Sequence, residues 1–542
     1  MPLTRALKTK FRCRSIATFL TFLFMSLGLH NASAAASAFD FGLFTTQRDE
    51  VRIPLEPGVE LIGKLYHKRG LKGPAPLVLL LNPWSIGSWV YAPQSQALAD
   101  KGFVVLAYNL RGWAGSTGEA ANGGPQDIAD VSSVIDWASK NPLIDSSRIG
   151  IAGVSLGAGV ALIAAAYEPR IKAVASMSTW TDFFTPIYGN NTKRIYWDTL
   201  LYLGSIVGTG NGHAAMMKET YEAIENNDFE KIHAYTDPRT PMYMLDLFAA
   251  HKPAVFLSQN MSDILFPVSD VWKFYEHLHT PKKMKLQPGI HATAEITGMF
   301  LPWQNNVWDD TTEWFERWLS KNPPDHMVES SEVQINLNNG KTYSGHSTAE
   351  LIKNSRRFYL SHDQDSKVFG ALTSEAVQSG DHSIENGKDS GVSSGLPILG
   401  SVAKIPLLKS HTNDHNIKTN KAAIFQMKIE DDNFRLLGIP HIQLRVRAEG
   451  QQAQLVTHVF RVDRKGKWQL VSMTPYTLRD FNPTETQTIE FDLYGAFAQF
   501  KKGDRLVIAI DTYDPEFQSP KNDFRVELEG NGDSFIDLPI GS

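Results

Sequence analysis

The stretch RIGIAGVSLGAG, from Arg148 to Gly159, joins an apolar, β-branched run to a small-residue helical pattern through the motif Gly153-x-Ser155-x-Gly157. This order predicts a strand, a sharp turn and a helix, with the serine at the turn. The two glycines let strand and helix pass closely, because neither carries a side chain. The helix would direct backbone N–H groups toward whatever the serine attacks. We therefore interpret Ser155 as a nucleophile; the alternative is a tight turn with an idle serine.

The composition of the chain sets limits on its organisation. A length of 542 residues is too long for one hydrophobic core and indicates two or three domains. The content of 42% hydrophobic and 20% charged residues is ordinary for a globular protein. A net charge of −5 gives no electrostatic argument for binding nucleic acid, so we expect no such partner.

Residues 1–34 have the pattern of a secretory signal peptide. A basic start without acids precedes the apolar run Ile16–Leu29, and small residues follow it. The run is too short for a comfortable membrane span, and an uncleaved anchor is the alternative. We expect a secreted or periplasmic protein with no stable membrane span after cleavage; mass spectrometry would then find an N-terminus at Ala35 or near Phe39. Cleavage would also remove Cys13, the single cysteine, so no disulfide is expected.

Residues 39–325 show the pattern of an antiparallel entry hairpin, up to about Pro76, followed by a parallel sheet. Fully apolar segments such as Leu77–Leu81 and Ala254–Ser258 alternate with helical patterns, as in a sheet covered on both faces. Lys283–Leu286 would be its last parallel strand. Residues 181–250 carry many aromatic residues and helical stretches but no strong strand, which predicts a helical cap inserted over the strand ends.

Residues 330–542 form a different kind of sequence. Short alternating segments, such as Ile442–Val446 and Leu506–Ile510, replace the long helical patterns. This spacing predicts a β-sandwich or jelly roll. His411 and His415 lie in a polar loop without acids at ligand spacing, so we expect no metal site.

A serine nucleophile needs a base to take its proton and an acid to hold that base. In a strand–turn–helix setting, acid and base follow the serine along the chain, each just past a strand. Asp263 follows the apolar strand after the predicted cap, and His291 follows the next strand. We therefore predict that Ser155, Asp263 and His291 form a catalytic triad. Asp270 is the alternative acid, although it lies well into the following helix; His291 could instead be a loop histidine that caps its neighbours.

An oxyanion hole completes such a site. One donor would be the N–H of Leu156, the residue after the nucleophile, and the second would come from the loop Asn82–Gly87. In that loop Trp84 could donate through its backbone or its indole N–H. The alternative role of Trp84 is packing against the cap.

With these residues in view, the sequence resembles the family of Xaa-Pro dipeptidyl-peptidases and cocaine-esterase-like acyl esterases. The matching features are Asn82-Pro83-Trp84, Arg111-Gly112, the Ser155 motif, the loops of Asp263 and His291, and the β-rich tail. The resemblance implies the α/β class: an α/β-hydrolase fold with a helical cap and a C-terminal jelly roll, acting on esters or amides without a cofactor. This chain departs from the family at Leu156 and Trp84, where the family usually has tyrosine.

The segment expected above Ser155 decides which substrate class we favour. Thr179–Tyr188 is apolar and aromatic, which suits an acyl or aryl group, and Trp180, Asp182 and Phe183 are the predicted substrate contacts. We therefore expect a small-molecule ester or amide substrate and an acyl esterase or acylase. An Xaa-Pro dipeptidyl-peptidase is the alternative, with Asp182 as the acid that could bind its ammonium. A non-catalytic secreted binding protein on a hydrolase scaffold is a lesser alternative.

Overall fold

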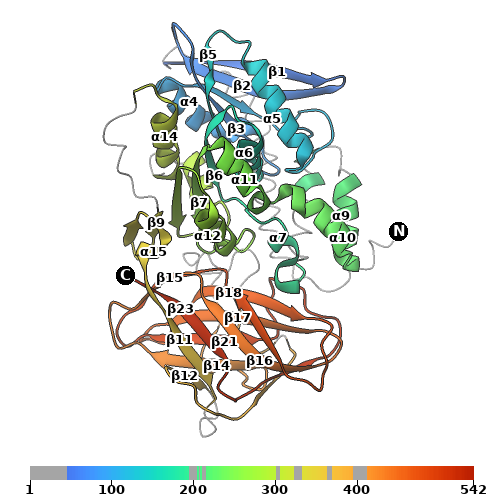
Figure 1. Cartoon of the computed structure of the whole chain (residues 1–542), viewed down its shortest axis with the longest axis vertical. Helices are drawn as coiled ribbons and strands as arrows, with labels where there is room; N and C mark the ends of the chain where they lie inside the picture. Colours follow the sequence, from blue (N-terminus) through green and yellow to red (C-terminus); the bar gives the residue numbers. More distant parts are fainter. Residues whose placement is uncertain are drawn as a thin grey trace.

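The computed structural model describes residues 45–194, 204–206, 208–209, 215–300, 306–322, 333–362, 369–387, 389–394 and 412–542. In these ranges the chain forms an α/β unit and a β-rich unit, which lie one above the other in Figure 1. The predicted signal peptide, residues 1–34, lies outside the described residues, so export and location stay predictions.

The α/β unit is built on one sheet with the strand order β1-β2-β4-β3-β5-β6-β7-β8-β9-β10. The pairs between β4 and β9 are parallel, and those at both edges are antiparallel. The strands are β1 (Thr46–Glu56), β2 (Val59–Lys68), β3 (Ala75–Leu81), β4 (Val104–Tyr108), β5 (Ile144–Val154), β6 (Ile171–Met177), β7 (Ala254–Asn260), β8 (Lys282–Gln287), β9 (Val333–Asn336) and β10 (Thr342–Gly345).

The edge of this sheet formed by β8, β9 and β10 differs from what the sequence predicted. β8 is not the last parallel strand, because β9 runs parallel to it, and β10 pairs antiparallel with β9. Residues 333–345 therefore extend the first sheet, although the sequence pattern placed them in the second domain. Val333 and Ile335 are buried in the α/β core, while Gln334 and Asn336 are half-buried. This alternation looks the same in an edge strand and in a sandwich strand, so the pattern alone did not separate them.

Helices cover both faces of the sheet, as the alternating pattern predicted. On one face α5 (Pro125–Ala138), α6 (Leu156–Tyr167), α11 (Leu245–His251) and α12 (Val268–His277) share one hydrophobic core with the strands. On the other face α4 (Ala92–Asp100), α14 (Asn306–Leu319), α13 (Thr293–Phe300) and the 3₁₀ turn η2 (Ser88–Tyr91) close a second core (Figure 1). Helix α13, which follows the His291 loop, was not predicted.

The described residues of the predicted cap form helices, turns and loops, and none of them lies in a strand. Its elements are α7 (Thr185–Tyr188), η3 (Gly189–Asn191), α9 (Ala215–Asn226), α10 (Phe229–Thr236), η4 (Asp237–Arg239) and η5 (Pro241–Met244). Apolar side chains of α7, α9 and α10, among them Ile187, Ile224 and Ile232, form a small core of their own. Residues 195–203, 207 and 210–214 of the predicted cap lie outside the described residues. In the described ranges, every helix is too short or too polar to cross a membrane.

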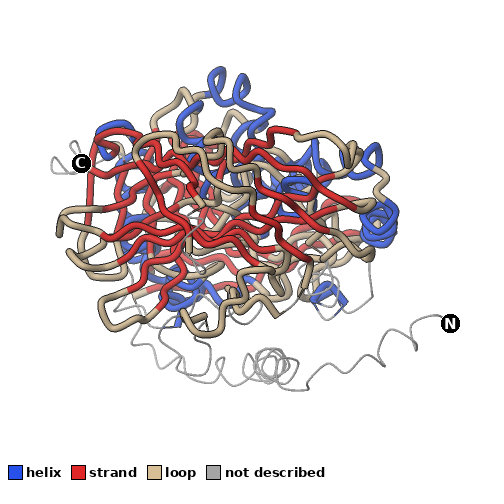
Figure 2. The backbone as a smooth tube through the Cα atoms, turned by 90° about the horizontal axis from the view of Figure 1, so that it is seen from below, coloured by secondary structure: helices blue, strands red, loops and turns tan. Residues whose placement is uncertain are grey.

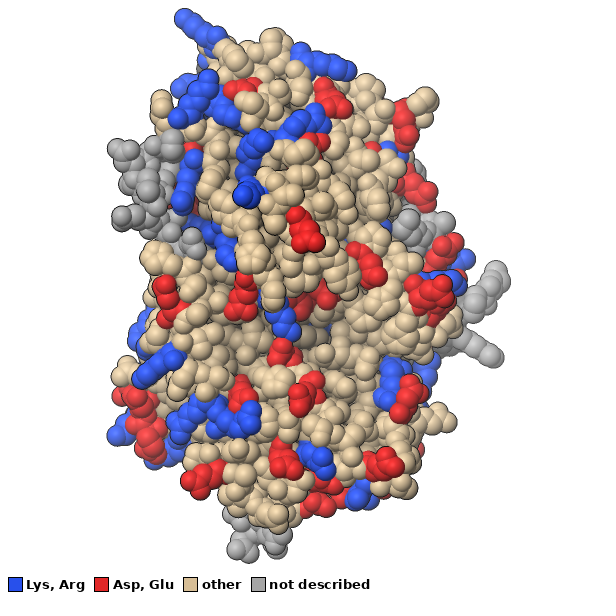
Figure 3. Space-filling view, in the orientation of Figure 1, with Lys and Arg blue, Asp and Glu red and all other residues tan. Residues whose placement is uncertain are grey.

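The β-rich unit confirms the predicted second domain type. After the short helix α15 (Thr348–Leu351), its strands are β11 (Ile352–Ser361), β12 (Gly370–Thr373), β13 (His382–Glu385), β14 (Ala422–Lys428), β15 (Arg435–Gly438), β16 (His441–Glu449), β17 (Ala453–Val462), β18 (Trp468–Leu478), β19 (Gln487–Asp492), β20 (Ala496–Gln499), β21 (Arg505–Asp511), β22 (Arg525–Leu528) and β23 (Phe535–Gly541). Their pairing is antiparallel except between β12 and β14. Figure 2 shows how strands dominate this end of the molecule. Acidic and basic side chains are interspersed over its face in Figure 3.

The two units are joined by polar contacts, and those made by Arg194 are buried. The Arg194 guanidinium, buried at the base of the cap, donates to the Tyr494 hydroxyl of the β-rich unit at 2.6 Å. The same guanidinium donates to the carbonyl oxygen of Ile264, in the loop after β7. Lys273 of α12 pairs with Asp492 of β19 at 2.7 Å. The β-rich unit therefore reaches the loop that follows β7.

Helix α6 passes unusually close to the sheet at two glycines. A Cβ atom on Gly157 would lie 2.2 Å from the carbonyl oxygen of Leu81, at the end of β3. A Cβ atom on Gly153 would lie 2.3 Å from the Gly157 carbonyl carbon. Since real Cβ atoms do not approach backbone atoms so closely, the strand–turn–helix crossing requires both glycines.

We expect Gly157→Ala to destabilise the protein by about 3 kcal/mol or more, because the added methyl group must push helix and strand apart. Thermal or urea unfolding measures the effect. Gly73→Ala is the matched control. Its added Cβ would meet nothing within 4 Å, so the stability of this variant should differ from that of the wild type by less than about 0.5 kcal/mol. A Gly157→Ala protein as stable as the control would contradict this account of the crossing.

Candidate active site

Ser155 sits at the turn between β5 and α6, as the sequence predicted. Its backbone angles are φ 57° and ψ −117°, a conformation that costs energy for a residue with a side chain. Its N–H donates to the carbonyl oxygen of Met177, at the end of β6, at 3.0 Å. The turn is therefore fixed through its backbone, which leaves the hydroxyl available for other contacts.

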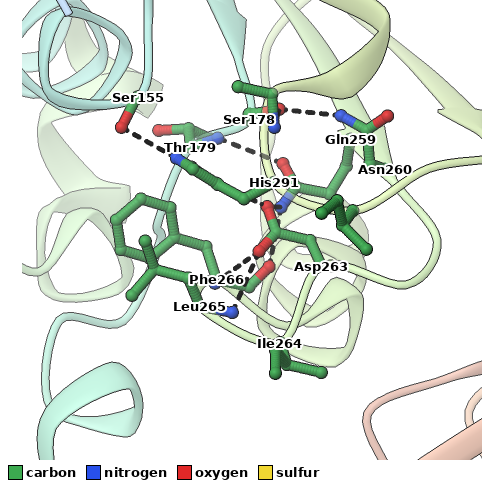
Figure 4. Close-up of polar contacts among 12 residues, drawn as sticks. Ser155, Ser178, Thr179, Gln259, Asn260, Asp263, Ile264, Leu265, Phe266 and His291 are labelled. Atoms are coloured by element: carbon green, nitrogen blue, oxygen red, sulfur yellow. Dashed lines mark hydrogen bonds and ion pairs between the residues drawn. The ribbon is translucent and has the colours of Figure 1, made fainter. Parts of the chain in front are cut away.

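The structure brings Ser155, His291 and Asp263 into one hydrogen-bonded chain (Figure 4). His291 Nδ1 lies 2.8 Å from Asp263 Oδ2, and His291 Nε2 lies 2.9 Å from Ser155 Oγ. An ionised carboxylate only accepts, so Nδ1 carries the proton and donates to Asp263. His291 Nε2 is then the acceptor for the serine hydroxyl. This is the arrangement in which an imidazole can take a proton from an alcohol.

Asp263 is held from several sides. Its Oδ1 accepts the backbone N–H groups of Leu265 and Phe266, each at 3.0 Å, and Gln259 Nε2 donates to Oδ2 at 3.2 Å. Asp263 is 1% exposed, and these donors stabilise the charge of its carboxylate in place of water. The alternative acid, Asp270, lies inside α12. The acid that contacts the histidine is therefore Asp263.

A second buried network lies beneath the histidine loop, and the sequence analysis did not find it. Ser178 Oγ accepts the N–H of Ala292 at 3.1 Å and the side-chain amide of Asn260 at 2.9 Å. The same amide group donates to Glu295 at 2.8 Å. Glu295 is fully buried, and burial raises its pKa. This network fixes the residue next to His291; the polar residues in otherwise apolar segments were the only signal for it.

The predicted oxyanion loop lies beside the serine. Leu156 opens α6, and the first N–H groups of a helix have no acceptor within it. Trp84 lines the same pocket as Ser155, and its ring packs against Trp113 with centroids 4.7 Å apart. Asn82 shapes the loop, since its amide donates to the carbonyl oxygen of Ile86 at 3.2 Å.

A pocket with mostly apolar and aromatic walls opens at the serine. Its described walls are Trp84, Asn122, Ser155, Leu156, Trp180, Phe183, Pro186, Ile187, Thr220, Tyr221, Ile224, Tyr235, Leu265 and Phe266. Two of the predicted substrate contacts, Trp180 and Phe183, are among them. The third, Asp182, is not; its carboxylate accepts the N–H of Phe184 at 2.8 Å. The described walls contain no charged side chain.

The described residues also bear on cofactor chemistry. Within the ranges given above, no three His, Cys, Asp or Glu side chains are grouped so that they could hold a metal ion. His415 lies in these ranges, whereas His411 does not.

Two sequence profiles match the chain. The profile of the X-Pro dipeptidyl-peptidase (S15 family) matches residues 69–293, and that of the X-Pro dipeptidyl-peptidase C-terminal non-catalytic domain matches residues 346–529. The first match spans the Ser155, Asp263 and His291 positions, and the second covers most of the β-rich unit. The chain belongs to the family of X-Pro dipeptidyl-peptidases (S15 family).

Solved structures of low sequence identity share the fold of both units. An α-amino acid ester hydrolase has a TM-score of 0.70 at 15% identity, covering 92% of this chain and 97% of that one. A CocE/NonD family hydrolase from Staphylococcus aureus has a TM-score of 0.69 at 13% identity, covering 91% and 93%. An uncharacterized 31.7 kDa protein from Escherichia coli is 37% identical over 89 residues, which is 16% of this chain and 31% of that protein. Matches to the first curated relatives span only 31% to 36% of their length.

We expect Ser178→Ala to lower kcat about tenfold or more with little change in KM, because the N–H of Ala292 loses its acceptor and the histidine loop shifts. Steady-state kinetics on an activated ester measures both constants. Ser176→Ala is the matched control: its buried hydroxyl donates to the carbonyl oxygen of Ala158, away from the histidine loop. Equal kcat losses in the two variants would show that Ser178 acts only through general stability.

Proposed function

We propose that the protein is a serine hydrolase that cleaves carboxylic esters through an acyl-enzyme intermediate, with acyl groups that fit an apolar pocket. The observation that carries this proposal is the hydrogen-bonded chain from Ser155 through His291 to Asp263, with Ser155 in the wall of that pocket. Membership of a hydrolase family supports the same reaction type.

The proposed reaction starts with proton transfer from Ser155 Oγ to His291 Nε2 while Oγ attacks the substrate carbonyl carbon. Asp263 stabilises the imidazolium that forms, and its own hydrogen bonds keep the ring in orientation. His291 then gives the proton to the departing alkoxide, which leaves an acyl group on Ser155. A water molecule then attacks the acyl-enzyme, with His291 again as the base. This step releases the carboxylic acid and restores the Ser155 hydroxyl.

The negative charge that develops on the substrate oxygen needs donors that are already in place. In this proposal one donor is the N–H of Leu156, which stands at the start of α6 next to the nucleophile. Trp84 supplies the second donor in this proposal. Trp84 lines the pocket together with Ser155, and an indole N–H can donate but not accept.

The pocket favours an ester with an uncharged acyl group over a peptide with a free N-terminus. A peptidase of the X-Pro type must hold an ammonium group, and a buried ammonium needs a carboxylate partner. The described pocket walls have none. Burial raises the pKa of Asp182, and its oxygen is already engaged by a backbone N–H, so both features weaken it as an ammonium partner. The X-Pro dipeptidyl-peptidase remains the second candidate because its family profile matches.

The nucleophile is tested by Ser155→Ala. This variant should lose covalent labelling by a fluorophosphonate and retain turnover reduced by about 10⁴-fold or more, as expected when a triad nucleophile is removed. Gel fluorescence and ester hydrolysis give the two readouts, and Ser133→Ala, which removes an exposed hydroxyl on α5 outside the pocket, is the control. Full activity in Ser155→Ala would refute the proposed mechanism.

The substrate class is tested by comparing kcat/KM on a short-chain aryl ester with that on Gly-Pro and Ala-Pro anilides. We expect hydrolysis of the ester and little or no cleavage of the anilides, since the pocket offers no carboxylate for their ammonium. Activated esters are easy substrates, so the low anilide rate is the informative result. Anilide cleavage of similar efficiency that is lost in Asp182→Asn would establish the peptidase instead.

A further inference from the structure

We propose that the pocket at Ser155 binds an extended hydrocarbon acyl chain, and that Ile224 of the cap limits the length of that chain. The inference rests on the proposed esterase function and names the substrate class of that same site. It starts from the described walls of the pocket, which come from two separate hydrophobic cores.

One end of the pocket belongs to the α/β unit and the other end to the cap. Near Ser155 the walls include Trp180 and Phe266, which belong to the hydrophobic core on the sheet. Further walls are Ile224 of α9 and Tyr235 of α10, which belong instead to the small core of the cap. Helices α9 and α10 lie side by side at the flank of the α/β unit (Figure 1). The pocket therefore runs from the proposed nucleophile into the cap.

A row of aromatic rings links the two ends of the pocket. The centroid of the Phe266 ring lies 5.1 Å from that of His291 and 5.3 Å from that of Trp180. The Phe183 ring follows at 4.8 Å from Trp180, and the Tyr235 ring at 6.0 Å from Phe183. All of these residues except His291 line the pocket, and Phe183 packs against both cores. An acyl group on the nucleophile would thus meet apolar surface from the histidine to the cap.

The row of rings is fixed from behind. Trp180 packs against Gly159 of α6, and its indole N–H donates to the carbonyl oxygen of Arg239 at 2.7 Å. The Arg239 guanidinium in turn lies over the Tyr235 ring, 3.9 Å from the centroid. A wall that is held in this way cannot adjust freely to each ligand. It should therefore discriminate between acyl chains by how well they fill the pocket.

The chemistry of the walls favours a hydrocarbon chain. The described walls carry no charged side chain, so a charged group on the acyl part would be buried without a partner. Each methylene group that leaves water for an apolar wall improves binding by up to about fourfold. Because apolar walls continue into the cap, an acyl chain that reaches the cap should be preferred over an acetyl group.

Ile224 lies at the cap end of the pocket. Its side chain is 3% exposed and belongs both to the pocket wall and to the cap core. Among the described residues of α9, none contributes to the core on the sheet, so this wall is the one supplied by the cap alone. A chain that is longer than the pocket would have to displace Ile224 from the cap core. This contact would set the upper limit on acyl length.

The test measures kcat/KM for p-nitrophenyl esters from acetate to dodecanoate, below the concentrations at which the longer esters aggregate. In the full-length wild-type protein, we expect kcat/KM to rise by up to about fourfold for each added methylene until the chain fills the pocket, and then to fall. Ile224→Ala should move the best chain about two carbons longer, because the shorter side chain extends the pocket. Ile224→Phe should move the best chain in the opposite direction.

Ile232→Ala is the matched control. Ile232 is fully buried in the same cap core but is not among the described walls of the pocket. Both alanine variants remove the same atoms from the cap core, so both should lose stability, but only Ile224→Ala should change the length profile. If Ile224→Ala does not fold, Ile224→Val takes its place, with an expected shift of about one carbon.

The outcomes separate this inference from the proposed function. A length profile that is unchanged in Ile224→Ala, or that shifts equally in Ile232→Ala, would overturn the role of Ile224 and leave the esterase intact. Ester hydrolysis that depends on alcohol length in a series of alkyl acetates, but not on acyl length, would assign the pocket to the leaving group and also overturn the inference. Absence of any ester hydrolysis and of fluorophosphonate labelling would instead refute the proposed function.

Discussion

The close crossing of α6 over the sheet is the constraint on which the site depends. Gly157 lies against the carbonyl oxygen of Leu81, and Leu81 is the residue before the loop that carries Trp84. One backbone contact therefore sets the distance between the nucleophile turn and the loop proposed to complete the oxyanion hole. A larger residue at either glycine would move both halves of the site apart. The strained backbone of Ser155 persists because the crossing and the bond to β6 hold it.

Much of the site could be predicted because its geometry follows from topology. In a parallel sheet the carboxyl ends of the strands meet at one edge, so Ser155, Asp263 and His291 could be placed together from their positions after three strands. The same reasoning placed Trp180 and Phe183, which follow β6, in the pocket wall. Neither inference needed the orientation of a side chain, only the order of strands and loops.

What could not be predicted depends on contacts between side chains from distant segments. Ser178 and Glu295 support the histidine loop through hydrogen bonds that no spacing in the sequence indicates. The orientation of Asp182 could not be predicted either, because its carboxylate could accept the N–H of Phe184, two residues later, or face the substrate. The strands over 333–345 were assigned to the wrong sheet because alternation reports burial of one face, not which sheet buries it.

The contact between Arg194 and Tyr494 has a consequence for how this architecture can change. Arg194 is buried and binds a carbonyl oxygen of the loop that carries Asp263, while a tyrosine of the β-rich unit takes another of its donors. If that unit were deleted or exchanged for another, the guanidinium would lose a partner beside the proposed catalytic acid, and the loop would lose a support. The two units therefore cannot be treated as interchangeable parts, and sequence changes at their boundary are expected to occur in pairs, one on each side.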